Sequence, residues 1–296
     1  MRATRVSVLI TGGQGQLGRE LQRALLSQSD PPQVLALDLP DLDVTDADAV
    51  ERAIGQAKPD LVIHAAALTD TSLCEEDPAL AMRVNAQGSL HVARACRRAG
   101  AALVYVSTNE VFDGARGEPY GESDEPRPIN AYGRSKLEGE RLVQGTLPRH
   151  YVVRTAWLYA EGGDNFPAKV LRLASRTGRR ELSMVTDEVA TPTWARDLAQ
   201  AIIRLAALRA SAHPAYGVYH LTNAGYCSRY EWAAEVLRLA GPPWADVTLR
   251  PITSAEYGGG PPKPPFSALR NEAAARLGIT LRAWQEALGE YMGRGG

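Results

Sequence analysis

Short runs of apolar residues alternate with stretches of helical periodicity along the first half of the chain. The runs are rich in β-branched residues and resemble strands that are buried on both faces. Between them, apolar residues recur three and four positions apart, as at Leu17, Leu21 and Leu25. The expected strands are residues 5–10, 33–38, 58–67, 101–107 and 150–156. Five strand–helix alternations predict an α/β fold with a doubly wound, parallel, Rossmann-type sheet.

The pattern is less regular after Trp157, which indicates a smaller C-terminal α/β substrate domain. Helices are expected at 165–175, 195–208, 228–240 and 282–292, and strands at 181–185 and 214–221. We therefore expect a dinucleotide-binding domain from 1 to 160, to which 181–212 returns, and a substrate domain from 161–180 and 213–296. Residues 258–265 are rich in glycine and proline; they are more typical of a surface loop than of a lid.

Charge and cysteine content exclude several classes of protein. The 296 residues carry a net charge of -1, which gives no general attraction to nucleic acid or to an anionic membrane. The three cysteines lie far apart, without the spacing of a metal site or a disulfide framework. The first apolar run is too short for a signal peptide, and none is long enough to span a bilayer. These features predict a soluble cytoplasmic protein with no nucleic-acid or membrane partner.

A glycine-rich turn follows the first expected strand and precedes the first helix, with the spacing Gly12-x-x-Gly15-x-x-Gly18. Glycines at such a turn let the backbone approach a pyrophosphate, whose charge is stabilised by the helix N-terminus. Asp38 follows about 20 residues after Gly18, where an acid can accept a hydrogen bond from a ribose 2′-hydroxyl. Asp38 therefore favours NAD over NADP, although a turn residue at a strand end would look the same.

Further candidates for cofactor contacts follow the second and third strands. Asp43 and Val44 could line an adenine pocket, although Asp46 as a helix N-cap could account for this stretch alone. The small residues 65–67 (Ala65, Ala66 and Ala67) would let backbone lie close to a cofactor. His64 is expected to be packed in the core and not catalytic.

Tyr132 and Lys136 are four positions apart on an expected helix, so their side chains share one face. An ammonium beside a phenol favours the ionised phenol, lowers its pKa and makes it a better general acid near neutral pH. Thr108 ends the fourth strand, where open parallel sheets bind ligands, and could orient a substrate carbonyl. Each residue also has a plain structural explanation, but together on a nucleotide fold they predict a hydride-transfer site.

Blocks of sequence along nearly the whole chain resemble the dTDP-4-dehydrorhamnose reductase family of the extended short-chain dehydrogenase/reductase superfamily. The blocks are residues 11–21, 43–46, 59–70, 84–88, 105–108, 111–114, 131–140, 154–159, 165–166, 190–199 and 217–221. The resemblance implies reduction of the C4 carbonyl of dTDP-4-dehydro-β-L-rhamnose by NADPH or NADH, giving dTDP-L-rhamnose. A dTDP-sugar is then the partner, and a homodimer is compatible with the family.

The resemblance also assigns roles to residues. It implies that Thr108, Tyr132 and Lys136 are catalytic. The cofactor would contact Gly12, Gly15, Gln16, Leu17, Ala65, Ala66, Ala67 and Lys136. The sugar nucleotide would contact Thr69, Trp157 and Asn165 together with Thr108, Asn109, Glu110 and Tyr132. Trp157 could pack on the sugar or base, or could simply be a core residue.

Departures from the family leave alternatives open. Asn109-Glu110 stands where the family usually has Asp-Tyr, which allows a reductase of another 4-keto sugar, or an epimerase. Arg196 occupies a position that is acidic in members with a magnesium-linked dimer, although Glu20 and Glu290 resemble the other ligands, so we expect no metal site. The regulatory β subunit of methionine adenosyltransferase also resembles this family; retention of the Thr108, Tyr132 and Lys136 set argues against a non-catalytic role.

Overall fold

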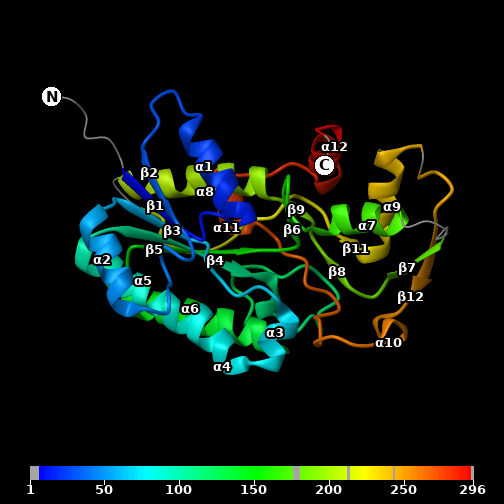
Figure 1. Cartoon of the computed structure of the whole chain (residues 1–296), viewed down its shortest axis with the longest axis horizontal. Helices are drawn as coiled ribbons and strands as arrows, with labels where there is room; N and C mark the ends of the chain where they lie inside the picture. The colour runs from blue at the N-terminus through cyan, green and yellow to red at the C-terminus, as the bar shows by residue number, and fades with distance from the viewer. Residues whose placement is uncertain (1–6, 176–180, 212–213, 243, 295–296) are drawn as a thin grey trace.

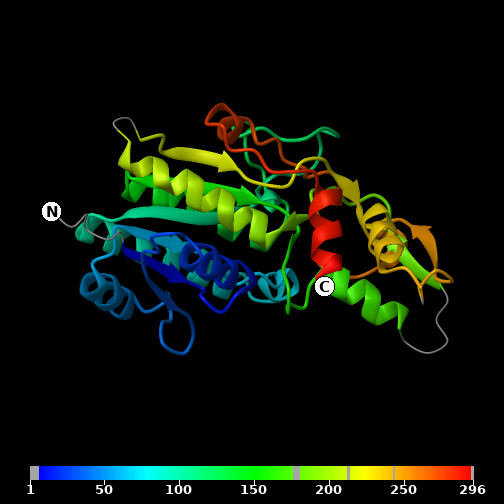
Figure 2. The same cartoon turned by 90° about the horizontal axis from the view of Figure 1, so that it is seen from above.

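The computed structural model describes residues 7–175, 181–211, 214–242 and 244–294. They form a large lobe around one sheet and a smaller lobe beside it (Figures 1 and 2). The first two residues of the strand expected at 5–10 lie outside the described residues.

The large lobe is built on a six-stranded sheet in which every neighbouring pair of strands is parallel. In order across the sheet, the strands are Gly217–His220 (β10), His150–Thr155 (β5), Ala102–Thr108 (β4), Leu61–His64 (β3), Ser7–Thr11 (β1) and Gln33–Leu37 (β2). The predicted doubly wound α/β fold is therefore confirmed, with one strand more than the first half of the chain supplies.

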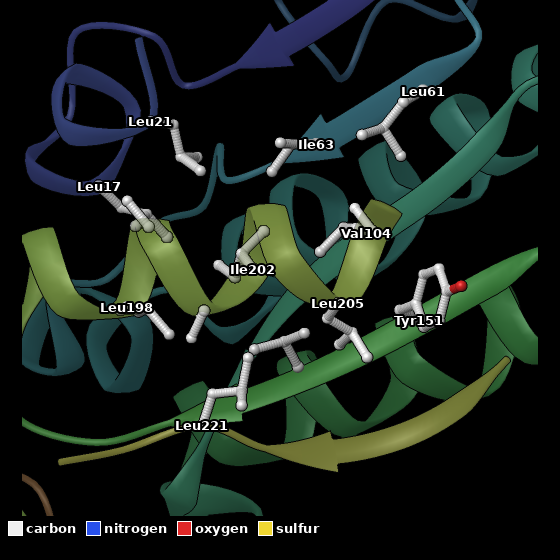
Figure 3. Close-up of a cluster of buried hydrophobic side chains, with 14 of the residues drawn as sticks. Leu17, Leu21, Leu61, Ile63, Val104, Tyr151, Leu198, Ile202, Leu205 and Leu221 are labelled. Carbon is white, nitrogen blue, oxygen red and sulfur yellow. The ribbon is translucent and has the colours of Figure 1, made fainter. Parts of the chain in front are cut away.

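Helices cover both faces of this sheet because its strands present apolar side chains to both sides. One face packs against Gln16–Leu26 (α1) and Ala195–Ala207 (α8), and Figure 3 shows the leucine- and isoleucine-rich contact. The other face packs against Ala47–Ala57 (α2), Gly88–Ala99 (α5) and Ala131–Thr146 (α6). Val62 faces one cluster while its neighbours Leu61 and Ile63 face the other, which explains the unbroken apolar runs in the sequence.

The helical stretch between β3 and β4 is divided into segments. Pro78–Ala81 (α4) and α5 flank a π-helix, Met82–Gln87 (η1). The fully buried Asn85 lies in η1; it exchanges hydrogen bonds with the Leu68 backbone and donates to Ser135 Oγ at 2.9 Å. This amide therefore joins the segment after β3 to the helix that carries Tyr132 and Lys136.

The smaller lobe collects short strands and three longer helices around an aromatic core. Its strand pairs are Glu181–Val185 (β7) with Thr248–Ile252 (β12), Val189–Ala190 (β8) with Cys227–Ser228 (β11), and Leu158–Tyr159 (β6) with Thr193–Trp194 (β9). Its helices include Phe166–Ala174 (α7), Arg229–Ala240 (α9), Ser254–Tyr257 (α10) and Trp284–Gly293 (α12). The remaining short elements are Thr71–Glu76 (α3), Asn109–Val111 (η2), Leu208–Ala210 (η3) and Glu272–Arg276 (α11).

The pairings differ from the expected division of the chain at two places. β10 was expected in the substrate domain, but it joins the main sheet beside β5. β7 was expected to return to the nucleotide domain, but it pairs with β12 in the smaller lobe; α8 does return and packs on α1. Strand partners of this kind are long-range contacts that local periodicity does not contain. The two-domain division itself stays a prediction.

Candidate active site

A cavity of about 920 Å³ opens along the carboxyl ends of β1, β3, β4 and β5. Every predicted cofactor residue lines it: Gly12, Gly15, Gln16, Leu17, Asp38, Asp43, Val44, Ala65, Ala66, Ala67 and Lys136. So do the predicted substrate residues Thr69, Thr108, Asn109, Glu110, Tyr132 and Trp157. The structure thus brings together residues that are separated by well over a hundred positions in the sequence.

The glycine turn is shaped for close backbone approach. Gly12 has a φ of 73°, and a Cβ there would lie 2.6 Å from the backbone nitrogen of Ala66. A Cβ at Gly18 would lie 2.1 Å from the carbonyl oxygen of Gly12. Since the N-cap of α1 is Gly15, which has no side chain to cap the helix, the first amides of α1 are left for an anion. Gln16 Oε1 is buried without a hydrogen-bond partner among the described residues. This arrangement fits the pyrophosphate of a dinucleotide.

The position of Asp38 is compatible with both roles that the sequence left open, and its contact with a cofactor ribose stays a prediction. Its carboxylate accepts the amides of Gln14 and Leu39, each at 2.9 Å, and so fixes the glycine turn to the end of β2. It also lines the cavity, and its carboxylate oxygens have lone pairs left to accept further hydrogen bonds. Asp46 caps α2 as predicted, while Asp43 accepts two hydrogen bonds from Thr45 at the cavity wall.

The first turn of α6 is pressed against η2. Asn130 caps the helix by accepting the Gly133 amide at 2.7 Å. A Cβ at Gly133 would lie 2.0 Å from the carbonyl oxygen of Glu110, so only glycine permits this contact. The contact brings the Tyr132 side chain close to that of Thr108. The predicted grouping of Thr108, Tyr132 and Lys136 at one cavity is therefore present.

Lys136 is not among the groups that shift the pKa of Tyr132, so the expected lowering is not found. Burial raises the pKa of Tyr132, and the nearby Glu110 carboxylate raises it further, while the Thr108 hydroxyl acts in the opposite direction. Burial also lowers the pKa of Lys136 to about 7. Desolvation disfavours the charged form of both side chains. Tyr132 is protonated at neutral pH, which is the state that a proton donor needs.

Two buried groups support Lys136 and the end of β4. Lys136 Nζ lies 4.2 Å from the centroid of the Tyr105 ring, and Glu140 opposes the fall in its pKa. Glu140 accepts two hydrogen bonds from Arg154, at 2.9 and 2.7 Å, and a third from Ser107 at 2.5 Å. Because Ser107 precedes Thr108, this ion pair fixes β4, β5 and α6 relative to one another.

The substrate side of the cavity contains the predicted residue Glu110 and three residues that were not predicted, Thr71, Thr155 and Lys263. Glu110 accepts a hydrogen bond from Asn130 at 2.7 Å and lies 3.4 Å from Lys263 Nζ. Thr71, Thr155 and Lys263 also line the cavity. Thr155 Oγ1 is buried without a hydrogen-bond partner among the described residues. The one available signal was that lysine is rare here, since the chain has only four.

Trp157 presents an aromatic face to the cavity. Its backbone has a φ of 39°, unusual for a bulky residue. The Arg229 guanidinium carbon lies 3.6 Å from the Trp157 ring centroid and 5.8 Å from that of Trp232. The two indoles are nearly parallel, at 5.5 Å and 7°. If Arg229 and Trp232 covered opposite faces of the Trp157 ring, they would lie farther apart than 5.8 Å. One face of the Trp157 ring is therefore covered by neither of them.

Two predictions of local role can be compared with the structure. Asn165 lies outside the cavity lining: its side chain caps α7 by accepting the Ala168 amide and donates to the Ala160 carbonyl. His64 is packed in the core as predicted, with Thr11 Oγ1 at 2.6 Å and Ser89 Oγ at 3.1 Å from its two ring nitrogens. Burial lowers its pKa to about 3, so it is neutral.

Residues considered for metal binding have other partners. Arg23 donates to Glu20 at 2.6 Å, and Arg282 donates to Glu290 at 2.7 Å. Across the described ranges, no group of three or more histidine, cysteine or acidic side chains is placed to hold a metal ion. No helix in the described part of the chain is long and apolar enough to cross a membrane. The homodimer stays a prediction, because the structure contains one chain.

A parallel sheet with a glycine turn at its carboxyl edge, and with Thr108, Tyr132 and Lys136 at the same cavity, defines an NAD(P)-dependent oxidoreductase of the short-chain dehydrogenase/reductase class. Residues 6–295 match the family described as RmlD substrate binding domain. The chain belongs to this family.

Named relatives agree with this assignment. The chain is 40% identical over 284 residues to a dTDP-4-dehydrorhamnose reductase from Streptomyces griseus, covering 95% of this chain and 91% of the relative. It is 38% identical over 283 residues to a dTDP-4-keto-6-deoxy-D-glucose reductase from Streptomyces niveus, covering 95% and 94%. A dTDP-4-dehydrorhamnose reductase from Bacillus anthracis, solved in complex with NADP, superposes with a TM-score of 0.90 at 34% identity, covering 98% of this chain and 100% of the other.

Proposed function

We propose that this protein uses NADPH or NADH to reduce the C4 carbonyl of dTDP-4-dehydro-L-rhamnose, giving dTDP-L-rhamnose in the cytoplasm. The observation that carries the proposal is that Thr108, Tyr132 and Lys136 line the cavity onto which the glycine turn opens. The relatives that carry this activity in their names support the choice of substrate.

The side chains divide the work of the reaction. The reduced nicotinamide, when bound, supplies the hydride. The glycine turn and the α1 N-terminus would hold the pyrophosphate, and Asp38 would hold the adenosine ribose. Tyr132, which is protonated at neutral pH, donates its proton to the carbonyl oxygen as negative charge develops there. Thr108 orients that oxygen, and the Lys136 ammonium stabilises the phenolate that remains.

A second candidate is a reductase of another dTDP-linked 4-keto sugar. Asn109 and Glu110 line the substrate side in place of the family's usual Asp-Tyr, and the Streptomyces niveus relative is named for dTDP-4-keto-6-deoxy-D-glucose. Both candidates place the same proton donor at a C4 oxygen. They differ in the groups that contact the rest of the sugar.

The test follows the loss of reduced-nicotinamide absorbance with each dTDP-4-keto sugar in turn. Replacing Tyr132 by phenylalanine removes the proton donor and should lower kcat about 10²- to 10⁴-fold, while NADPH affinity is retained. Tyr226→Phe is the matched control, because Tyr226 is 52% exposed and lies outside the cavity lining. Unchanged turnover in Tyr132→Phe would refute the assigned role. Turnover with only the glucose-derived keto sugar would select the second candidate.

A further inference from the structure

A segment of the smaller lobe reaches across to the cavity of the larger one. Residues 258–265 follow α10, and the chain here runs back toward α3 (Figure 1). The carbonyl oxygen of Pro262 accepts a hydrogen bond from Asn130 Nδ2 at 2.9 Å. The next residue, Lys263, donates to Thr71 Oγ1 at 2.8 Å. The glycine- and proline-rich stretch that the sequence indicated as a plain surface loop is therefore a strap over the substrate side.

Lys263 contributes a positive charge to the wall of the cavity. Its side chain is 28% exposed, and its ammonium lies 3.4 Å from Glu110 Oε1. Glu110 is held in place by Asn130, which donates to its other oxygen at 2.7 Å. Thr71 and Glu110 both line the same cavity as Lys263. The ammonium is thus held at the substrate side by partners on the opposite lobe.

The other cations of the cavity serve different places. Within the described residues, its lining contains three: Arg83, Lys136 and Lys263. Lys136 is buried against Tyr105, next to the proton donor. Arg83 lies in η1 beside Val84, which packs with the cluster that contains Val44, a residue of the predicted adenine pocket. On the substrate side, the charged groups of the cavity lining are therefore the Glu110 carboxylate and the Lys263 ammonium, and only the ammonium can pair with a diphosphate.

We propose that Lys263 binds the diphosphate of the sugar nucleotide, and that Glu110 holds the Lys263 ammonium in place while the substrate is absent. The class of ligand rests on the proposed function. Binding then exchanges a carboxylate for a phosphate at the same ammonium. Glu110 competes with the ligand, so Lys263 and Glu110 have opposite effects on affinity.

The opposite effects provide the test, which is calorimetric titration of the full chain with dTDP in the presence of saturating NADP⁺. Lys263→Met should weaken dTDP binding about 10- to 100-fold, since a charge-assisted hydrogen bond is lost. Lys263→Arg should keep most of the affinity, and Glu110→Gln should tighten binding by up to about fivefold. Lys169→Met is the matched control, because Lys169 is paired with Asp164 on the surface, outside the cavity lining.

Titration with thymidine, which carries no phosphate, separates the charge of Lys263 from the shape of the strap. The affinity for thymidine should be the same in the wild type and in Lys263→Met. An equal loss for thymidine and dTDP would show that the residue acts only through the strap, and would overturn the proposal. Unchanged dTDP affinity in Lys263→Met, weaker binding in Glu110→Gln, or a wild type that binds no dTDP would also overturn it.

These titrations do not depend on turnover. Failure to reduce dTDP-4-dehydro-L-rhamnose, together with the predicted loss of dTDP binding, would refute the proposed function and leave the assignment of Lys263 standing. Normal turnover of the wild type, together with unaltered dTDP affinity in Lys263→Met, would support the proposed function and refute the assignment of Lys263.

Discussion

Replacing Lys136 by methionine should abolish turnover and yet make the protein more stable. The side chain is 2% exposed, and burial lowers its pKa from an ordinary 10.5 to about 7. At about 1.4 kcal/mol per pKa unit, that fall corresponds to about 5 kcal/mol of unfolding free energy lost to the buried charge. Water in the cavity screens part of this cost, so we expect methionine to add about 2 to 5 kcal/mol.

The dependence on pH distinguishes this explanation from better packing. Between the folded pKa near 7 and the ordinary value of 10.5, the unfolded chain binds more protons at this lysine than the folded one. The stability of the wild type therefore rises with pH in this window relative to the variant. The advantage of Lys136→Met should be full below pH 7 and should fade as the pH approaches 10.5.

The assay is urea unfolding of the wild type and Lys136→Met at several pH values, with free energies from linear extrapolation. Lys169→Met provides the control, because its side chain is 49% exposed and should show no such trend. An advantage of Lys136→Met that stays constant across the window would refute the desolvation argument, and a loss of stability at pH 6 would refute it outright.

Three further predictions concern the supports of the site. Gly133→Ala should lower kcat about a hundredfold, because a Cβ placed 2.0 Å from a carbonyl oxygen must displace α6. Normal kinetics would contradict this prediction. The control is Gly145→Ala, which has open space around it on the same helix. Arg154→Met should lower the unfolding free energy in urea by about 3 to 5 kcal/mol, because it leaves Glu140 unpaired; additive costs in the Arg154→Met/Glu140→Met double variant would refute the pairing. Asp38→Ala should lower kcat/KM for NADH relative to NADPH, and an unchanged ratio would remove its assigned role.

Local patterns predicted most of the sheet because each strand is buried on both faces and each helix has an apolar stripe. Caps were equally accessible: Asp46 begins α2, and Ser228 forms a capping box with Glu231 at the start of α9. The π-helix was not accessible, since its apolar spacing blends into that of α4 and α5. The pairing of β10 with β5 and of β7 with β12 depends on contacts between distant segments.

The site shows the same limit at the level of single residues. The resemblance placed Asn165 beside the substrate, but its amide is engaged at the start of α7. An asparagine that precedes an apolar helical run is equally typical of an N-cap, and only the folded chain distinguishes the two. Lys263 is the opposite case, a cavity residue that was not predicted. Nothing in the local sequence indicates that the glycine- and proline-rich loop places this lysine next to Glu110.

The pKa of Tyr132 is raised where the spacing predicted that it would be lowered, so spacing alone does not determine the protonation chemistry of the site. The four-residue interval between Tyr132 and Lys136 specifies that a phenol and an ammonium share a helix face, and in water the ammonium would lower the phenol's pKa. In the folded chain Tyr132 is half-buried and Lys136 is buried, and desolvation is the largest contribution to the pKa shift of each. Burial makes Tyr132 a weaker acid than a free phenol, and it imposes on Lys136 the cost that Lys136→Met would remove. Stability and catalysis are therefore opposed at this helix, because the site uses a charge that the fold alone disfavours.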